Sequence, residues 1–228
     1  MAECVIQCEQ PIAFDLSADI ADTGRFVIID NYEISGGGII QEPLRDDQSL
    51  VREKVLLRNI KWEKSSILRE QRAECYSQKS ALVLVTGPSE SSRKEIAKEL
   101  EADLFAQGRI TYYLGIGSLI CGVDADLKAA APDTRHEHRA EHLRRFAEAA
   151  HLFLDSGAIL VSTAVDLNAE DPEIVRAILQ NYPVLVVWSG DMAGTDIHVD
   201  LRVQAETQGE AASRLKPMLQ DQGVIFKY

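Results

Sequence analysis

Between residue 81 and the C-terminus, short apolar runs alternate with longer amphipathic segments, and this alternation constrains the fold most. The run over 81–86 is continuous and rich in β-branched residues, which is typical of a strand buried on both faces. Strands that alternate with helices build a parallel sheet covered on both sides. We therefore predict a doubly wound, mainly parallel α/β sheet, with further strands over 110–114, 158–165, 184–188 and 197–201.

Helices are predicted over 92–107, 136–155 and 172–180, and from Thr207 to Leu219. Asp171-Pro172 opens the third of them with Pro near the first turn, where it is well tolerated. Gly157 is expected to end the second in a left-handed conformation. The apolar positions at helical spacing are Ile96, Leu100, Leu104 and Phe105 in the first helix and Leu143, Phe146, Ala147, Ala150 and Leu154 in the second.

The N-terminal 45 residues have a different pattern, that of short β segments. Strands are predicted over 3–7, 25–30 and 33–40. The glycines at 36–38 allow a tight bend or a close approach of the backbone, and a phosphate-binding role for them is disfavoured because no helix start follows. Residues 46–79 are predicted to be a charged connector with one helix over 65–76, in which Ile67 and Leu68 face inward and Arg69, Glu70 and Arg72 face water.

Composition excludes several classes of protein. The formal net charge of −12 repels phosphate backbones, so nucleic-acid binding is disfavoured. No apolar run approaches the roughly 18 residues of a membrane helix, and the first ten residues lack a signal-peptide pattern. The four cysteines form no C-x-x-C pair, which argues against a zinc site and for reduced thiols. We expect a cytoplasmic protein.

The loop after the first buried strand lies where ligands bind in open α/β sheets. The P-loop pattern G-x-x-x-x-G-K-[ST] fits this strand–loop–helix context, but the residues fit it badly. Gly87 is in place, whereas Ser92 stands at the second glycine, Arg93 at the lysine and Lys94 at the hydroxyl that holds magnesium. Glu90 adds a negative charge to a loop that should attract anions.

Two interpretations of this loop stay open. One is an altered anion site, built from Gly87, Ser89, Ser91, Ser92, Arg93 and Lys94 with free backbone N–H groups. The other is a structural strand–turn–helix corner. Arginine is a poor substitute for the lysine because it is longer and planar, and loss of the hydroxyl removes a magnesium ligand.

From residue 26 to the end, the chain resembles the C-terminal part of the bifunctional sulfate-activation protein, which joins an elongation-factor-Tu-like GTPase to an adenylylsulfate kinase. The Gly-Arg-Phe-Val and Gly-Gly-Gly-Ile-Ile strings resemble the last strands of the β-barrel domain of that GTPase. The resemblance implies a barrel fragment over 1–45, a connector over 46–79 and a P-loop domain over 80–228. Because the GTPase domain proper is absent, GTP binding is not implied.

The resemblance also marks departures in the kinase part. In the family, L-D-G-D-N-x-R follows the second strand and its aspartates serve the metal and the substrate hydroxyl. Here Gly115 and Gly117 replace the aspartates and Ile120 replaces the arginine. The family's R-x-E-N-x-R-R motif, which holds adenylylsulfate, keeps Arg139 but has His142 for the asparagine. For Arg139 and His142 the alternative to a ligand role is a surface position on a charged helix.

A basic lid that follows the fourth strand in this family has no counterpart here, because 188–194 run almost directly into the last strand. We therefore predict a catalytically inactive adenylylsulfate-kinase-like domain that serves as an interaction or regulatory module for a sulfate-activation-type GTPase. The alternative is a diverged phosphotransferase that uses Arg93, Lys94 and Arg139 with ATP and magnesium. Exposed edges of the truncated barrel suggest a homodimer as a further option.

Overall fold

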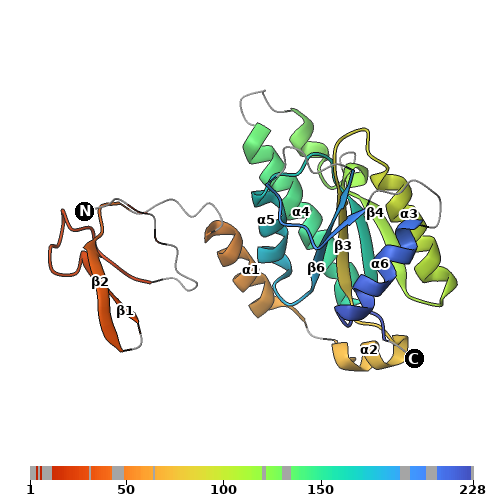
Figure 1. Cartoon of the computed structure of the whole chain (residues 1–228), viewed down its shortest axis with the longest axis horizontal. Coiled ribbons are helices and arrows are strands. Elements are labelled where there is room, and N and C mark those ends of the chain that lie inside the picture. The colour runs from red at the N-terminus through yellow and green to blue at the C-terminus, as the bar shows by residue number, and fades with distance from the viewer. Residues whose placement is uncertain are drawn as a thin grey trace. The chain divides into compact units, whose positions relative to one another are not determined.

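The computed structural model describes residues 4, 6, 12–30, 32–42, 49–63, 65–119, 122–129, 135–190, 196–203 and 210–226. The chain divides into two compact units, Met1–Asp47 and Gln48–Tyr228 (Figure 1). Within the described residues, no helix has both the length and the apolar character that a membrane span requires.

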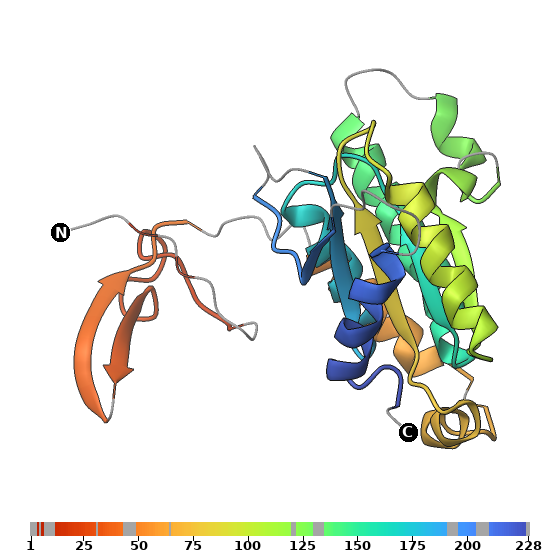
Figure 2. The ribbon, with the colours of Figure 1, turned by 45° about the vertical axis from the view of Figure 1, so that its right-hand side comes forward.

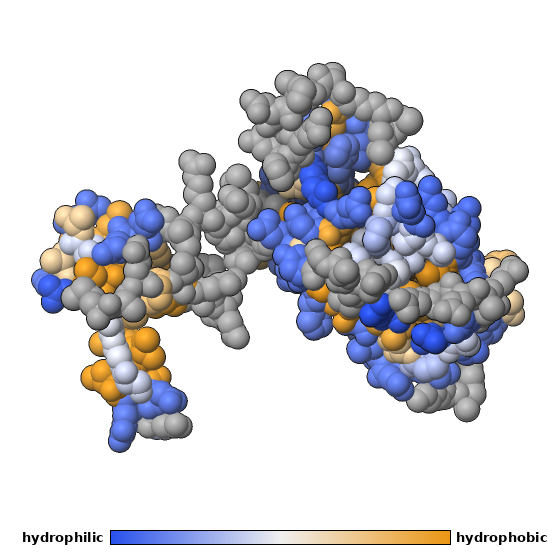
Figure 3. Space-filling view, turned by 45° about the horizontal axis from the view of Figure 1, so that its top comes forward, coloured by the Kyte–Doolittle hydropathy of each residue, from blue (hydrophilic) through white to orange (hydrophobic). Residues whose placement is uncertain are grey.

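The first unit is built around one antiparallel hairpin. Strand β1 (Arg25–Asp30) pairs with β2 (Glu33–Ile39), as the β-branched run and the turn at Tyr32 favour. The predicted close approach at the glycines is confirmed, since a Cβ on Gly38 would lie 2.7 Å from the ring of Phe26. Large apolar side chains of both strands stay exposed: Val27, Ile28, Ile29, Ile34 and Ile39. The surface of this unit shows orange, hydrophobic patches in Figure 3.

The second unit contains a five-stranded sheet in which every described pairing is parallel. The strands are β3 (Ala81–Thr86), β4 (Thr111–Gly115), β5 (Ile159–Thr163), β6 (Val184–Ser189) and β7 (Leu201–Val203), in the spatial order β4-β5-β3-β6-β7. The predicted fold class is therefore confirmed. Because β3 is central and its neighbours come later in the chain, the loop after β3 opens where the strand order reverses, which is the ligand position of such sheets.

Helices cover both faces of this sheet (Figures 1 and 2). Leu82 and Leu84 of β3 face α4 (Arg135–Asp155) and α5 (Glu170–Leu179), whereas Val83 and Val85 face α3 (Arg93–Ala106) and α6 (Glu210–Asp221). All of the apolar positions predicted for α4 are buried. The short 3-10 helices η1 (Ile116–Leu119) and η2 (Ala125–Ala129) follow β4.

Two predictions about helical side chains are wrong. Phe105 is 73% exposed, because Ile96, Leu100 and Leu104 recur every fourth residue and Phe105 lies about 100° around the helix from Leu104. Ile67 and Leu68 are also exposed, because the helix there, α2 (Arg69–Tyr76), begins only after them and has no buried residue.

The segment before the sheet contains a helix that the sequence did not predict, α1 (Ser49–Lys61). Its Val55 is fully buried against the α5 side of the core, while Leu56, Leu57 and Ile60 remain exposed.

Strand β7 begins at Leu201, where the prediction ended it, and Gly157 has the expected positive φ of 93°. The predicted strand over 3–7 lies mostly outside the described residues, and Thr207, Ile120 and the 191–195 part of the shortened lid segment lie wholly outside them.

Candidate functional site

The loop between β3 and α3 lies at the carboxyl edge of the sheet, as a phosphate-binding loop does. Gly87 begins it with a φ of 151°, and a Cβ there would lie 2.2 Å from the carbonyl oxygen of Ser189 at the end of β6. Only glycine fits this conformation beside the neighbouring strand. The single P-loop residue that the sequence retains is therefore required by packing, whatever the loop binds.

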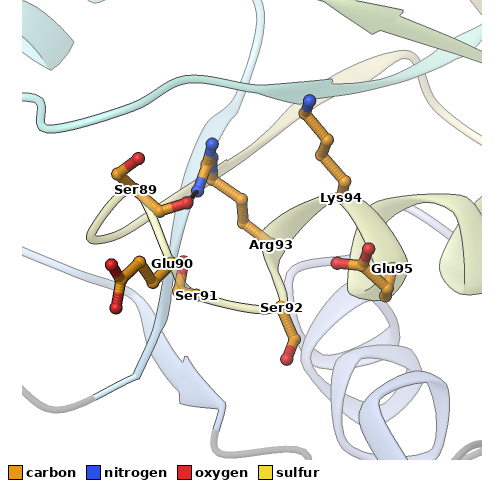
Figure 4. Close-up of a pocket in the computed structure, with 7 residues that line it drawn as sticks. All are labelled: Ser89, Glu90, Ser91, Ser92, Arg93, Lys94 and Glu95. Carbon is orange, nitrogen blue, oxygen red and sulfur yellow. Dashed lines mark hydrogen bonds between the residues drawn. The ribbon is translucent and has the colours of Figure 1, made fainter.

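Residues from Ser89 to Glu95 line an open hollow of about 300 Å³ (Figure 4). Its rim is mixed in charge, because Glu90 and Glu95 are exposed together with Lys94. In Figure 4 the side chain of Lys94 extends from the helix without turning toward Ser89. The side chains that line the hollow carry two carboxylates and two cations, those of Arg93 and Lys94, so they supply no net positive charge to attract a triphosphate.

Arg93, at the start of α3, turns its side chain back onto its own loop. The residue is only 6% exposed, and its Nη1 donates hydrogen bonds to the carbonyl oxygens of Pro88 and Ser89, both at 2.8 Å. Figure 4 shows the guanidinium reaching across to Ser89. The cation at the lysine position therefore donates through Nη1 to backbone carbonyls of its own loop, while its Nε is buried without a hydrogen-bond partner.

The loop hydroxyls divide into two groups. Ser89 and Ser92 are exposed, whereas the Ser91 hydroxyl is buried and, like that of Thr86, has no hydrogen-bond partner in the structure. The backbone N–H of Ser91 donates to the carbonyl of Pro88 at 2.9 Å, closing a turn. That N–H group is thus already committed within the loop.

Arg139 on α4 is held by α5. Its Nε and Nη2 donate to both carboxylate oxygens of Asp171, with distances of 2.6–3.1 Å, and Nη2 also donates to the carbonyl of Asp166. Asp171 is 3% exposed and accepts a further bond from the backbone of Asn168, so it needs a cation in the folded state. Arg139 provides that charge.

His142, one turn along α4 from Arg139, lies against a buried acid. Its Nδ1 is 2.7 Å from Oδ2 of Asp124, a carboxylate with no exposure to solvent. The two predicted ligands of adenylylsulfate therefore share a helix, but each is bound to a separate acidic partner.

Charged pairs surround the Asp124–His142 contact. Arg145 binds Glu141 and Asp126, and Arg144 also binds Glu141. The hydrogen bond from Arg144, followed by that from Arg145, lowers the pKa of Glu141 to about 2. Arg145 likewise lowers the pKa of Asp126 to about 2. Arg144 and Arg145 are thus engaged in ion pairs with Glu141 of the same helix and, for Arg145, with Asp126 of η2.

The end of β4 contributes no acid. A Cβ on Gly115 would lie 3.2 Å from the Tyr113 hydroxyl and 3.3 Å from that of Thr163, two groups that hydrogen-bond to each other at 3.0 Å. A side chain at Gly115 would require this pair to shift by a few tenths of an ångström, whereas Gly117 has open space around it. No cluster of His, Cys, Asp and Glu able to hold a metal ion occurs among the described residues.

A comparison of sequences decides the family. The sequence model of adenylylsulphate kinase matches residues 79–206, more than half of the chain. The chain belongs to the adenylylsulphate kinase family. The match covers β3 with its loop, α4, α5 and β6, the elements that carry the site just described.

The relatives of this chain include a longer bifunctional enzyme and a shorter kinase. The bifunctional enzyme NodQ of Rhizobium tropici is 30% identical over 178 residues, 77% of this chain but only 26% of NodQ. The adenylyl-sulfate kinase of Clostridium kluyveri is 36% identical over 121 residues, 53% of this chain and 58% of the relative. The chain thus spans about a quarter of NodQ and less than two thirds of the Clostridium enzyme.

Solved kinase structures agree with the fold. The APS kinase CysC of Mycobacterium tuberculosis superposes with a TM-score of 0.55 at 25% identity, covering 63% of this chain and 99% of that one. The hexameric APS kinase of Thiobacillus denitrificans gives a TM-score of 0.55 at 15% identity, covering 85% and 40%. This second match supports the fold alone.

Sequence reasoning missed the internal partners of the candidate ligands. Asp124 binds His142, Asp171 binds Arg139, and the Tyr113 hydroxyl lies beside Gly115. None of these three residues belongs to a predicted site. Asp171 was visible only as a helix start, and a single sequence carries no signal that would pair it with Arg139, 32 residues away.

Proposed function

We propose that the second unit is a pseudokinase, an adenylylsulfate-kinase fold that does not transfer phosphate and serves as an interaction or regulatory module. The observation that carries this proposal is the position of Arg93, whose guanidinium is bound to the carbonyls of Pro88 and Ser89. Phosphoryl transfer depends on cations aimed at the phosphates. A cation that already satisfies its own loop is lost to that task.

Three further positions support the same conclusion. The hydroxyl pair of Tyr113 and Thr163 fills the space beside Gly115, and Arg139 is bound by Asp171. Lys94 puts a positive charge where a magnesium ligand would be needed, and magnesium prefers oxygen ligands. These residues do not fit a magnesium–nucleotide complex, so we derive no catalytic step through one.

The partner that we infer is the GTPase part of a sulfate-activation-type protein. The NodQ match is longer than the 150 residues from Lys79 to the C-terminus, so it includes residues before position 79, where the match to the kinase family model begins. The hairpin of the first unit leaves Val27, Ile29 and Ile34 exposed, as expected of strands that pack against further strands. Such a complex would be cytoplasmic, and a homodimer through the same hairpin is the competing assembly.

One observation favours a second function, a diverged adenylylsulfate phosphotransferase. The chain is 36% identical over 121 residues to a protein named adenylyl-sulfate kinase. In this alternative Arg93, Lys94 and Arg139 would rearrange to hold ATP and the substrate.

Transfer of labelled γ-phosphate from ATP to adenylylsulfate separates the two functions. The Clostridium kluyveri relative serves as the positive control. We expect no product above the buffer blank over hours at high protein concentration. Product that disappears in the Arg93→Ala variant would overturn the pseudokinase proposal and establish the phosphotransferase.

A further inference from the structure

The ring of His151 on α4 lies in an aromatic cage that joins four parts of the second unit. It packs edge to face against Trp62, which follows α1, with ring centroids 4.6 Å apart. On its other side it packs edge to face against Tyr182, at 5.5 Å. Arg69 of α2 closes the cage, with its guanidinium 4.1 Å from the centre of the Tyr182 ring.

The cage provides no acceptor for one of the imidazole nitrogens. His151 is 8% exposed, and its Nδ1 is buried without a hydrogen-bond partner. A neutral imidazole tolerates this because one ring nitrogen carries no hydrogen. An imidazolium has two N–H donors, so charging this ring would bury a charged donor that nothing accepts.

The charged groups around the ring come from three helices. Arg58 of α1 binds Glu148 of α4 at 2.8 Å and the carbonyl of Ile178 at 2.9 Å. Arg69 donates to the carbonyl of Asn181 at 2.8 Å, and Asp155 of α4 accepts a long bond of 3.4 Å from the Tyr182 hydroxyl. The two carboxylates favour a charged ring, whereas burial and the two guanidinium groups oppose it.

We propose that the neutral ring of His151 holds Trp62, and with it the end of α1, against α4, and that protonation of the ring by acid releases them. We call this contact the His151 clasp. The released part is the segment through which the chain enters the second unit. Burial, followed by the charge of Arg58, lowers the pKa of His151, in agreement with a ring that is neutral when the clasp is closed.

The test uses ¹⁹F NMR of the full chain labelled with 5-fluorotryptophan. The chain contains two tryptophans, Trp62 in the cage and Trp188 in the buried strand β6, so the second resonance reports whether the sheet stays folded. Trp62→Phe assigns the signals. The pH is lowered from 8 to 5 in the parent, in His151→Phe, which keeps an aromatic ring but cannot be protonated, and in the matched control His198→Gln, whose histidine is exposed.

We expect the Trp62 resonance to move in a one-proton transition with a midpoint below about 6.5, the ordinary histidine pKa, while that of Trp188 stays in place. The transition should vanish in His151→Phe and persist in His198→Gln. A constant Trp62 signal in the parent, a transition that survives in His151→Phe, or joint movement of both resonances would each overturn the clasp. Because the parent titration decides on its own, the proposal remains testable if His151→Phe does not fold.

Discussion

Arg139 and Asp171 form a two-pronged ion pair that joins α4 to the first turn of α5. Both carboxylate oxygens of Asp171 accept bonds from Arg139, and the acid itself is almost entirely buried. The arginine that most resembles a family ligand is thus the counter-charge of an internal acid. Stability measurements can test this ion pair.

Replacing Arg139 by alanine should destabilise the unit by about 2–4 kcal/mol, because a buried carboxylate loses its cation. Arg139→Lys, which keeps the charge but not the two-pronged geometry, should cost less. Urea unfolding at pH 7 measures both. Arg176→Ala is the matched control, since that arginine pairs with the exposed Glu173 on the same α5 and only at 3.9 Å with Asp200, and it should cost about 0.5 kcal/mol or less. Equal effects of Arg139→Ala and Arg176→Ala would refute the buried-pair account.

The loop glycine offers a second comparison. Gly87→Ala should lower stability by more than about 3 kcal/mol or prevent folding, because the new Cβ would meet the carbonyl of Ser189 at 2.2 Å. Gly108→Ala has a positive φ of 73° but nothing within 4 Å, so it should cost only about 1 kcal/mol. Thermal unfolding of the two variants separates the steric from the conformational cost. Similar losses in both would contradict the tight corner between β3 and β6.

Strands β3, β4, β5 and β6 were predictable because each carries its own apolar signal, whereas β7 begins only where its predicted strand ended. The run over 81–86 is apolar at every position, and all six residues are buried. Helix α1 was not predictable in the same way, because Leu56, Leu57 and Ile60 lie among charged residues and are exposed, whereas Val55 is the buried residue among the side chains described from position 54 on. Its apolar residues follow no single stripe, so periodicity gave no clear helix.

The candidate site was predictable in its position but not in its bonds. The strand–loop–helix context identified the loop that begins at Gly87 correctly. The direction of the Arg93 side chain depends on which acceptors the folded loop offers, and the partners of Arg139 and His142 come from segments 32 and 18 residues away. Such long-range pairings are decided by tertiary structure, which one sequence does not reveal.

The pH dependence of stability should include a contribution from Glu141. Its pKa is about 2 in the folded protein against an ordinary value of 4.5, so its ion pairs stabilise the fold above pH 4.5 and are lost as the pH falls toward 2. Glu141→Gln should therefore be less stable than the parent at pH 7 by about 1 kcal/mol, since the pair is partly exposed. Urea midpoints at pH 7 and pH 3 test this. The difference in stability between the parent and Glu141→Gln should be smaller at pH 3 than at pH 7, and a larger difference at pH 3 would contradict the lowered pKa.

Arg93 should contribute to the stability of its loop rather than to ligand binding. Arg93→Ala removes two hydrogen bonds from a buried charged donor and should destabilise the unit by about 1–3 kcal/mol. Lys94→Ala, next to it and exposed, should change stability by less than about 0.5 kcal/mol. Chemical denaturation of the two variants provides the comparison. If Arg93→Ala left the free energy of unfolding unchanged, the guanidinium would be free to bind anions.

Isothermal titration calorimetry with ATP and magnesium, and separately with adenylylsulfate, tests the central claim most directly. If Arg93 and Arg139 are committed to the protein's own carbonyls and carboxylates, neither titration should produce heat beyond dilution at millimolar ligand. Saturable binding of ATP with magnesium at micromolar concentration, lost in Arg93→Ala, would contradict the account.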